Sequence, residues 1–257
     1  MKNRILAIAI NAFKESMRDR ILFAVLLFAL FIIASSLFLG TISFDQEQKI
    51  IKDFGLTAIF LLQIFIIVFV GANLVYKEVE RRTFFMILPK PINRAEVIVG
   101  KWLGLGTTIF LMTVLSSAIF FIIVGLKNGD AGGFGPLALA IAVGYIESLL
   151  LIMVSILFSA LTSPVLASVY TISIFLIGHS SSLLLTIIQK EPNVILKTAV
   201  SFLYYIFPNL EKFNIRNGVI YGVVPATEQL WWIVVYAVAY GIVLFIAAKI
   251  IFEKREF

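Results

Sequence analysis

The sequence contains no cysteine and only one histidine. The lack of cysteine excludes disulfides, thiolate metal sites and cysteine nucleophiles. A single histidine excludes the paired histidines, four residues apart on a helix, of a zinc metalloprotease. Soft ligands for copper are equally scarce, because the methionines Met17, Met86, Met112 and Met153 lie far apart in the chain. We therefore expect no metal or cofactor to be held by this chain.

Charge is also scarce, at 14% of residues, whereas hydrophobic residues make up 61% and the mean hydropathy is +1.04. Soluble domains are about 45–50% apolar and about 25% charged. At 257 residues the chain is long enough for six membrane-spanning helices of about 20 residues each. The composition predicts an all-α integral membrane protein. The net charge of +6 is small for a nucleic-acid binder, and we expect no nucleic-acid partner.

Six apolar stretches predict the spans: about 21–42, 54–76, 102–126, 137–161, 165–188 and 230–252. Residues 2–20 alternate with helical period and predict an amphipathic helix at the membrane interface, although a purely basic topogenic flank is the alternative. No small-residue cleavage site follows, so we expect no removed signal peptide. Residues 45–53 are predicted as a short acidic loop. Residues 189–229 are too apolar for a solvated loop and predict one or two short outer helices, re-entrant or interfacial.

The distribution of Lys and Arg predicts the orientation. With six spans, the side that holds both termini and residues 77–101 carries 14 basic residues, and the opposite side carries 7. We therefore expect a multi-pass protein of the cytoplasmic (inner) membrane with both termini in the cytoplasm.

Two ionisable residues fall within predicted spans, where charge is costly and usually functional. Glu147 borders a helical face with Gly144, Ser148, Ser155 and Ser159, and His179 is expected to share a face with Ser168, Thr171, Ser182 and Thr186. The candidates for a transport pathway or a subunit seam are Glu147, Ser148, Ser155, His179 and Ser182. For the serines, close helix packing is the favoured alternative. An intramembrane hydrolase is disfavoured, because His179 and its neighbour Ser180 point about 100° apart on a helix.

The largest block of charge is the loop of residues 77–101, between the second and third spans. It combines basic side chains with an apolar Phe84-Phe85-Met86 tip, and two prolines stiffen its return to the membrane. Such a combination suits docking to a soluble partner better than simple anchoring by positive charge. No phosphate-binding loop is present, since Trp102 follows Gly100-Lys101 where Ser or Thr is required. Any ATP and Mg²⁺ would then be bound by a separate subunit.

The loop sequence Glu78-Val79-Glu80-Arg81-Arg82-Thr83-Phe84, with Leu88-Pro89-Lys90-Pro91-Ile92-Asn93-Arg94 and Gly100-Lys101, resembles the cytoplasmic loop of ABC-2-type ABC transporter permeases. The branch associated with multicopper-enzyme maturation is the most similar, and Tyr205–Phe213 resembles its outer segment. The resemblance covers the whole chain and implies a permease subunit that pairs with a second permease, expected as a homodimer, with a heterodimer left open. It also implies a separate ABC ATPase subunit, and a seam built from the second and fifth spans.

Carried over by resemblance, the elements that couple to the ATPase are Glu78, Glu80, Arg81, Arg82, Thr83, Phe84 and Arg94. The expected activity is ATP-driven export of a hydrophobic or amphipathic cargo, with membrane lipids around the bundle and no catalysis in this chain. Two alternatives remain open at this stage. One is a mechanotransmitting subunit that serves a periplasmic partner without a channel, and the other is a proton-coupled secondary transporter using Glu147 and His179.

Overall fold

The computed structural model describes residues 2–42, 46–73, 93–128, 133–190 and 193–254, and every regular element within these ranges is helical. The first elements are α1 (Lys2–Met17), α2 (Arg20–Ile42), α3 (Glu47–Ile66), the π-helix η1 (Ile67–Gly71), α6 (Arg94–Asn128) and α7 (Phe134–Leu161). They are followed by α8 (Pro164–His179), α9 (Ser181–Lys190), α10 (Val194–Ile206), the 3₁₀ helix η3 (Leu210–Phe213), α11 (Arg216–Ile220) and α12 (Thr227–Lys254). The all-α prediction is confirmed.

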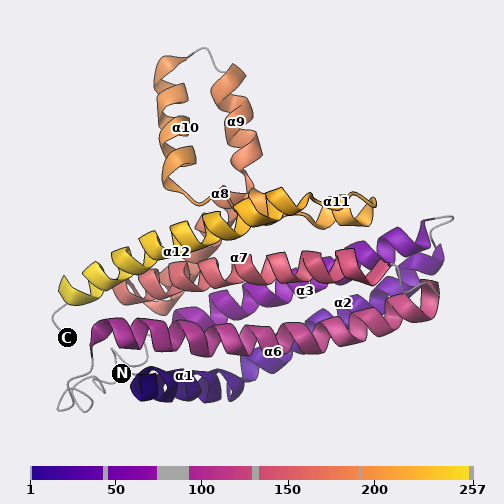
Figure 1. Cartoon of the computed structure of the whole chain (residues 1–257), viewed down its shortest axis with the longest axis horizontal. Coiled ribbons are helices and arrows are strands. Elements are labelled where there is room, and N and C mark those ends of the chain that lie inside the picture. The colour runs from indigo at the N-terminus through magenta and orange to yellow at the C-terminus, as the bar shows by residue number, and fades with distance from the viewer. Residues whose placement is uncertain (1, 43–45, 74–92, 129–132, 191–192, 255–257) are drawn as a thin grey trace.

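Five of the described helices, α2, α3 with η1, α6, α7 and α12, are long and apolar enough to cross a membrane. They run alongside one another along the long axis of the molecule (Figure 1). A sixth crossing is counted only if the bent pair α8 and α9 forms a single span. The bundle thus has the architecture expected of an integral membrane protein.

Two helices begin earlier than the apolar stretches that predicted them. The predicted acidic loop 45–53 is wrong from Glu47 onward, because these residues form the first turns of α3. Ile51 in this region is fully buried, so the polar turns still present an apolar side to the bundle. Likewise α6 begins at Arg94, so the last residues of the predicted loop 77–101 are helical.

The predicted fifth span, 165–188, is broken at Ser180. The helices α8 and α9 meet at an angle of 57°. With 16 residues, α8 is about 24 Å long and falls short of the roughly 30 Å hydrocarbon core. Beyond the break, α9 and α10 form a hairpin that stands out from the bundle (Figure 1). The short elements η3 and α11 then pack against α3, α7 and α8.

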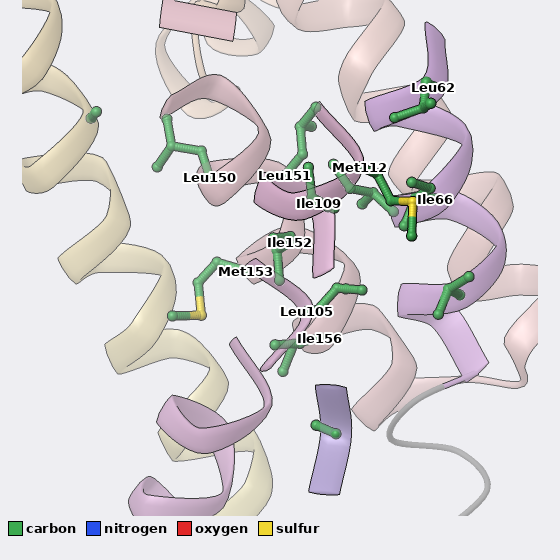
Figure 2. Close-up of a cluster of buried hydrophobic side chains, with 14 of the residues drawn as sticks. Leu62, Ile66, Leu105, Ile109, Met112, Leu150, Leu151, Ile152, Met153 and Ile156 are labelled. Atoms are coloured by element: carbon green, nitrogen blue, oxygen red, sulfur yellow. The ribbon is translucent and has the colours of Figure 1, made fainter. Parts of the chain in front are cut away.

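The bundle core is built mainly around α7, whose central residues are buried on all sides. Leu151, Ile152 and Ile156 pack with side chains of α3 and α6, among them Ile66 and Ile109 (Figure 2). Over the stretch from Ser148 to Ile156, every residue of α7 except Leu149 is buried, as expected for the central helix of a bundle.

The amphipathic helix α1 packs along the first half of α6. Contact is close because α6 carries glycine at two positions one turn apart. A Cβ at Gly100 would lie 2.6 Å from Cγ2 of Ile8, and one at Gly104 would lie 2.6 Å from both Cβ of Ala12 and the carbonyl oxygen of Ala9. Small residues spaced in this way let two helix backbones approach closely within a membrane.

Candidate functional site

The only histidine of the chain lies between two carboxylates. Nε2 of His179, in the last turn of α8, is 2.7 Å from Oε1 of Glu147, near the middle of α7. Nδ1 of the same ring is 3.4 Å from Oε2 of Glu211 in η3. Glu147 is 1% exposed, so its carboxyl has no access to bulk water. This arrangement is satisfied either by an imidazolium between two carboxylates or by a neutral imidazole and one protonated carboxyl.

Arg216, the first residue of α11, completes this polar cluster, which we define as Glu147, His179, Glu211 and Arg216. Its guanidinium carbon lies 3.8 Å from the centre of the Phe60 ring of α3, a cation–π contact. Its Nε donates to Oδ1 of Asn214 at 3.4 Å. Burial lowers the pKa of Arg216, while the charges of Glu147, Asp53 and Glu211 oppose that shift. Arg216 therefore stays cationic and offsets part of the local negative charge.

The cluster borders a small cavity of about 10 Å³. Its polar lining comes from Glu147, Arg216 and Gln63, and its apolar lining includes Phe60 and Ala140. This volume is about what a single water molecule needs, and three polar side chains can bind one. The cavity is too small to admit a cargo molecule in this conformation.

A second set of hydrogen bonds joins three spanning helices on the Gln63 side of the cavity. Nε2 of Gln63 donates to Oγ1 of Thr113 in α6 at 3.0 Å, and Oγ of Ser148 in α7 donates to Oε1 of Gln63 at 3.1 Å. Gln63 is 1% exposed and Ser148 is 2% exposed. Polar groups buried at this depth need such partners, because each unsatisfied group is costly.

The segment after the hairpin is held against the end of α8 by shape as well as by charge. A Cβ at Gly178 would lie 2.6 Å from Cγ of Leu210 and 2.7 Å from the carbonyl oxygen of Pro208, so only glycine leaves room there. The backbone N–H of Asn209 donates to the Tyr236 hydroxyl of α12 at 2.8 Å. Oγ of Ser181 donates to Oδ1 of Asn209, also at 2.8 Å. These contacts hold η3, which carries Glu211, in place beside α8 and α12.

The structure brings together only part of the set predicted as a pathway or seam. Glu147 and His179 are in contact, and Ser148 lies one residue further along α7. Ser155 is buried elsewhere and donates to the carbonyl oxygen of Ile67 in η1 at 3.4 Å. Ser182 lies on α9, past the 57° bend, and is exposed, so it does not share a helical face with His179 as predicted.

Of the residues predicted to couple to an ATPase, only Arg94 falls within the described part of the chain. Its Nη1 donates to the carbonyl oxygen of Phe252, near the end of α12. The other six lie outside the described residues: Glu78, Glu80, Arg81, Arg82, Thr83 and Phe84.

No motif or periodicity in the sequence predicted a role for Glu211, Arg216 or Gly178. Glu211 is 32 positions from His179 in the chain, and no local periodicity connects them. A weak signal existed nevertheless, because Glu211 and Arg216 are charged residues within a stretch too apolar for a solvated loop.

Five long apolar helices that pack around the buried carboxyl of Glu147 indicate a multi-pass membrane protein. The model of the family described as ABC-2 family transporter protein matches residues 6–257. The chain therefore belongs to this family and is a membrane subunit of an ABC transporter. No curated protein matches the chain.

Proposed function

We propose that this chain is the permease subunit of an ATP-driven exporter that moves a hydrophobic or amphipathic cargo. A separate ATPase subunit, with its own ATP and Mg²⁺, would dock on the loop of residues 77–101. The observation that carries the proposal is the family match over residues 6–257. The positive-inside distribution of Lys and Arg supports a location in the inner membrane with both termini in the cytoplasm.

The elements next to the loop are suited to transmit force. α6 begins at Arg94 and continues for 35 residues, about 50 Å, through the whole bundle. Its first half is packed against α1 through Gly100 and Gly104, and Arg94 is bonded to the end of α12. A push on the loop would therefore displace α1, α6 and the end of α12 together.

Docking is tested by co-purification with the ATPase. The double substitution Arg81→Glu, Arg82→Glu should abolish association. The two introduced carboxylates would repel the acidic groups that the ATPase is expected to present to the arginines. A matched control, Lys49→Glu with Lys52→Glu, reverses the charge of two basic residues that are predicted to lie on the opposite side of the membrane. It should leave association intact. Undiminished co-purification of the first variant would rule out the docking assignment.

The polar cluster is proposed to act as an outer gate. It joins η3 and α11 to α7 and α8, and it closes the one-water cavity beside Glu147. Separating these elements would open the centre of the bundle toward the outer side, as helix pairs do in alternating-access cycles.

The gate is tested with a single cysteine, since the chain has none of its own. Ala140 lines the cavity and is 3% exposed. Ala140→Cys should resist a membrane-impermeant maleimide added from outside, and His179→Ala should make it reactive. Ser182→Ala is the control and should leave it protected. Protection that persists in the His179→Ala background would exclude the gate.

A second copy of the chain is proposed to complete the transporter. α8 exposes Val165, Leu166, Val169 and Leu176 on its outward side, which fits the expected use of the fifth span in a seam. A Val169→Cys variant should then form a disulfide-linked dimer on oxidation. A monomer under all oxidising conditions would argue against a homodimer seam on α8.

Two observations favour other candidates. The 2.7 Å contact of Glu147 with His179 fits a proton relay, as a proton-coupled transporter requires. Transport by the reconstituted chain without ATP would support that candidate. The small size of the cavity beside Glu147 fits a mechanotransmitting subunit that relays ATPase strokes to a periplasmic partner. Ala140→Cys that stays protected in every nucleotide state would support this one.

A further inference from the structure

An apolar groove runs along the outside of the bundle between α6 and α12, with α7 as its floor. Its volume is about 470 Å³. Leu150 and Met153 of α7 point toward α12 at its base (Figure 2), and Ala237 and Phe245 of α12 and Trp102 of α6 form its sides. The Trp102 indole N–H donates to the carbonyl oxygen of Leu149 at 2.8 Å, so the ring meets the groove as an apolar surface.

The dimensions of the groove select its occupant. On α12 it extends from Val234 to Phe245, about 16 Å at 1.5 Å per residue. A helix 10 Å across would displace roughly 1,300 Å³ over that length, far more than the groove holds. A lipid tail is narrower, and half the hydrocarbon core of a bilayer is about 15 Å thick. The groove therefore fits one acyl chain better than a helix of another subunit.

Positive charge lies at one end of the groove. Lys249 is one turn beyond Phe245 on the same face of α12. Its Nζ is 3.7 Å from Oε1 of Glu253, and both side chains are exposed, so the pair is loose. At the same end Arg94 crosses from α6 to the carbonyl oxygen of Phe252. An anionic headgroup would meet a lysine there while its tail entered the groove.

We propose that the groove between α6, α7 and α12 is a binding site for one acyl chain of an anionic phospholipid whose headgroup is held by Lys249. The bound lipid bridges α6, which begins at the predicted docking loop, to α12. The site is distinct from the polar cluster and does not depend on which cargo the protein moves.

A second groove provides an internal control. It lies between α6 and α7, has a volume of about 520 Å³ and includes Thr113, Ser117 and Ala142 in its lining. No basic residue lines it. Beyond its outer end Lys127 is paired with Glu47 at 2.7 Å, a closer pair than Lys249 with Glu253. We expect no preference for anionic lipid at this second groove.

The experiment uses Trp102 as its reporter. The other tryptophans are removed by Trp231→Phe and Trp232→Phe, which leaves Trp102 alone because the chain has three. The protein is reconstituted into phosphatidylcholine with increasing fractions of phosphatidylglycerol that carries brominated tails, which quench indole fluorescence on contact. Specific binding should give quenching that saturates at low mole fraction. Brominated phosphatidylcholine should quench only in proportion to its amount.

Four variants sharpen the test. Lys249→Gln should weaken the preference for the anionic lipid about fivefold, the effect expected of one basic residue at a membrane surface. Glu253→Gln should strengthen it by releasing Lys249. Gly241→Phe should abolish the saturable quenching, because a Cβ at Gly241 would lie 3.6 Å from Leu150 and the ring would fill the groove. Ala142→Phe, in the second groove, should change nothing.

Three outcomes would overturn the proposal. One is quenching proportional to lipid fraction for both headgroups, which would mean only bulk lipid at the groove. Another is the absence of quenching by either lipid, which would mean that a second copy or another protein covers the groove. The third is an unchanged headgroup preference in Lys249→Gln. That surface substitution also serves as the decisive variant if Gly241→Phe does not fold.

Discussion

The end of the bundle at which α1 packs on α6, here the α1 end, and the half that contains the polar cluster are held together by different physical means. At the α1 end, α1 meets α6 through glycines that leave no room for a side chain at Gly100 or Gly104. In the half with the polar cluster, α7, α8, η3 and α11 meet through a histidine, two carboxylates and a guanidinium. Shape alone governs the first contact, whereas charge adds to shape at the second, where Leu210 packs on Gly178.

This difference assigns a mechanical role to each end. Helices whose backbones are closely packed have no alternative set of contacts to adopt, so they move as one body. The ion pairs of a cluster can be exchanged for hydrogen bonds to water or altered by protonation. Such a cluster therefore adopts two arrangements of similar energy more readily than a packed core does. We therefore expect the α1 end to transmit movement and the half with the polar cluster to change its internal contacts.

The largest expected effect comes from removing the histidine. His179→Ala leaves the Glu147 carboxylate buried without its partner, and breaking a buried pair in this way costs about 3–5 kcal/mol. The measurement is the thermal unfolding midpoint of the purified protein. The double variant Glu147→Met, His179→Leu should recover most of the loss, because apolar replacements of a buried pair are often neutral. Equal destabilisation by the double variant would show that the pair matters mainly through packing.

The next effect tests the α1 end. Gly104→Ala forces the new methyl against Cβ of Ala12 and the carbonyl oxygen of Ala9, at a cost of about 1–3 kcal/mol. Gly135→Ala is the matched control, because no atom lies within 4 Å of its added Cβ. Unfolding midpoints of the two variants should fall only for Gly104→Ala. If both behave alike, the close approach of α1 to α6 does not stabilise the protein.

A smaller effect isolates the guanidinium of the polar cluster. Arg216→Lys keeps the charge but loses the planar contact with Phe60, which is worth about 0.5–1 kcal/mol. A double-mutant cycle with Phe60→Leu measures this coupling directly from the four unfolding midpoints. Additive losses would mean that Arg216 acts through its charge alone.

The smallest effect is predicted for Ser182→Ala. Ser182 is exposed on α9, beyond the break that separates it from His179. Its removal should change stability by less than about 0.5 kcal/mol, as surface substitutions usually do. A large loss in the same unfolding assay would place α9 against a partner and revise the comparison of the two ends.

The positions of the spanning helices were largely predictable, because each depends on a local run of apolar residues. The first turns of α3 were missed because Asp45 to Asp53 is charged, although Ile51 turns inward. The break at Ser180 was missed because neither proline nor glycine occupies it. Its cause is non-local, since Leu210 and Pro208 pack onto Gly178 and Asn209 binds Ser181.

The candidate site was half predictable for the same reason. Glu147 and His179 stand out as ionisable residues in apolar stretches, and that property is local. Their partners Glu211 and Arg216 come from a segment that returns to the bundle after the α9–α10 hairpin. Only the folded chain reveals that return, because it depends on hydrogen bonds from Asn209 to Tyr236 and from Tyr240 to Ile206.

The π-helix η1 has a consequence for the direction in which the second span presents its end. A ring closed from residue i to i+5 contains one residue more than an α-helical ring. Two serines from other helices, Ser155 and Ser168, donate to the carbonyl oxygens of Ile67 and Val68 in this turn. The π turn therefore absorbs one residue without changing the direction of the side chains beyond it. Deleting one residue between Ile67 and Gly71 would leave Asn73 at its present azimuth in a uniform α-helix, whereas uniform winding without the deletion would rotate Asn73 by about 100°. The extra residue and the two serine hydroxyls that bind this turn together set the azimuth of the second span at Asn73.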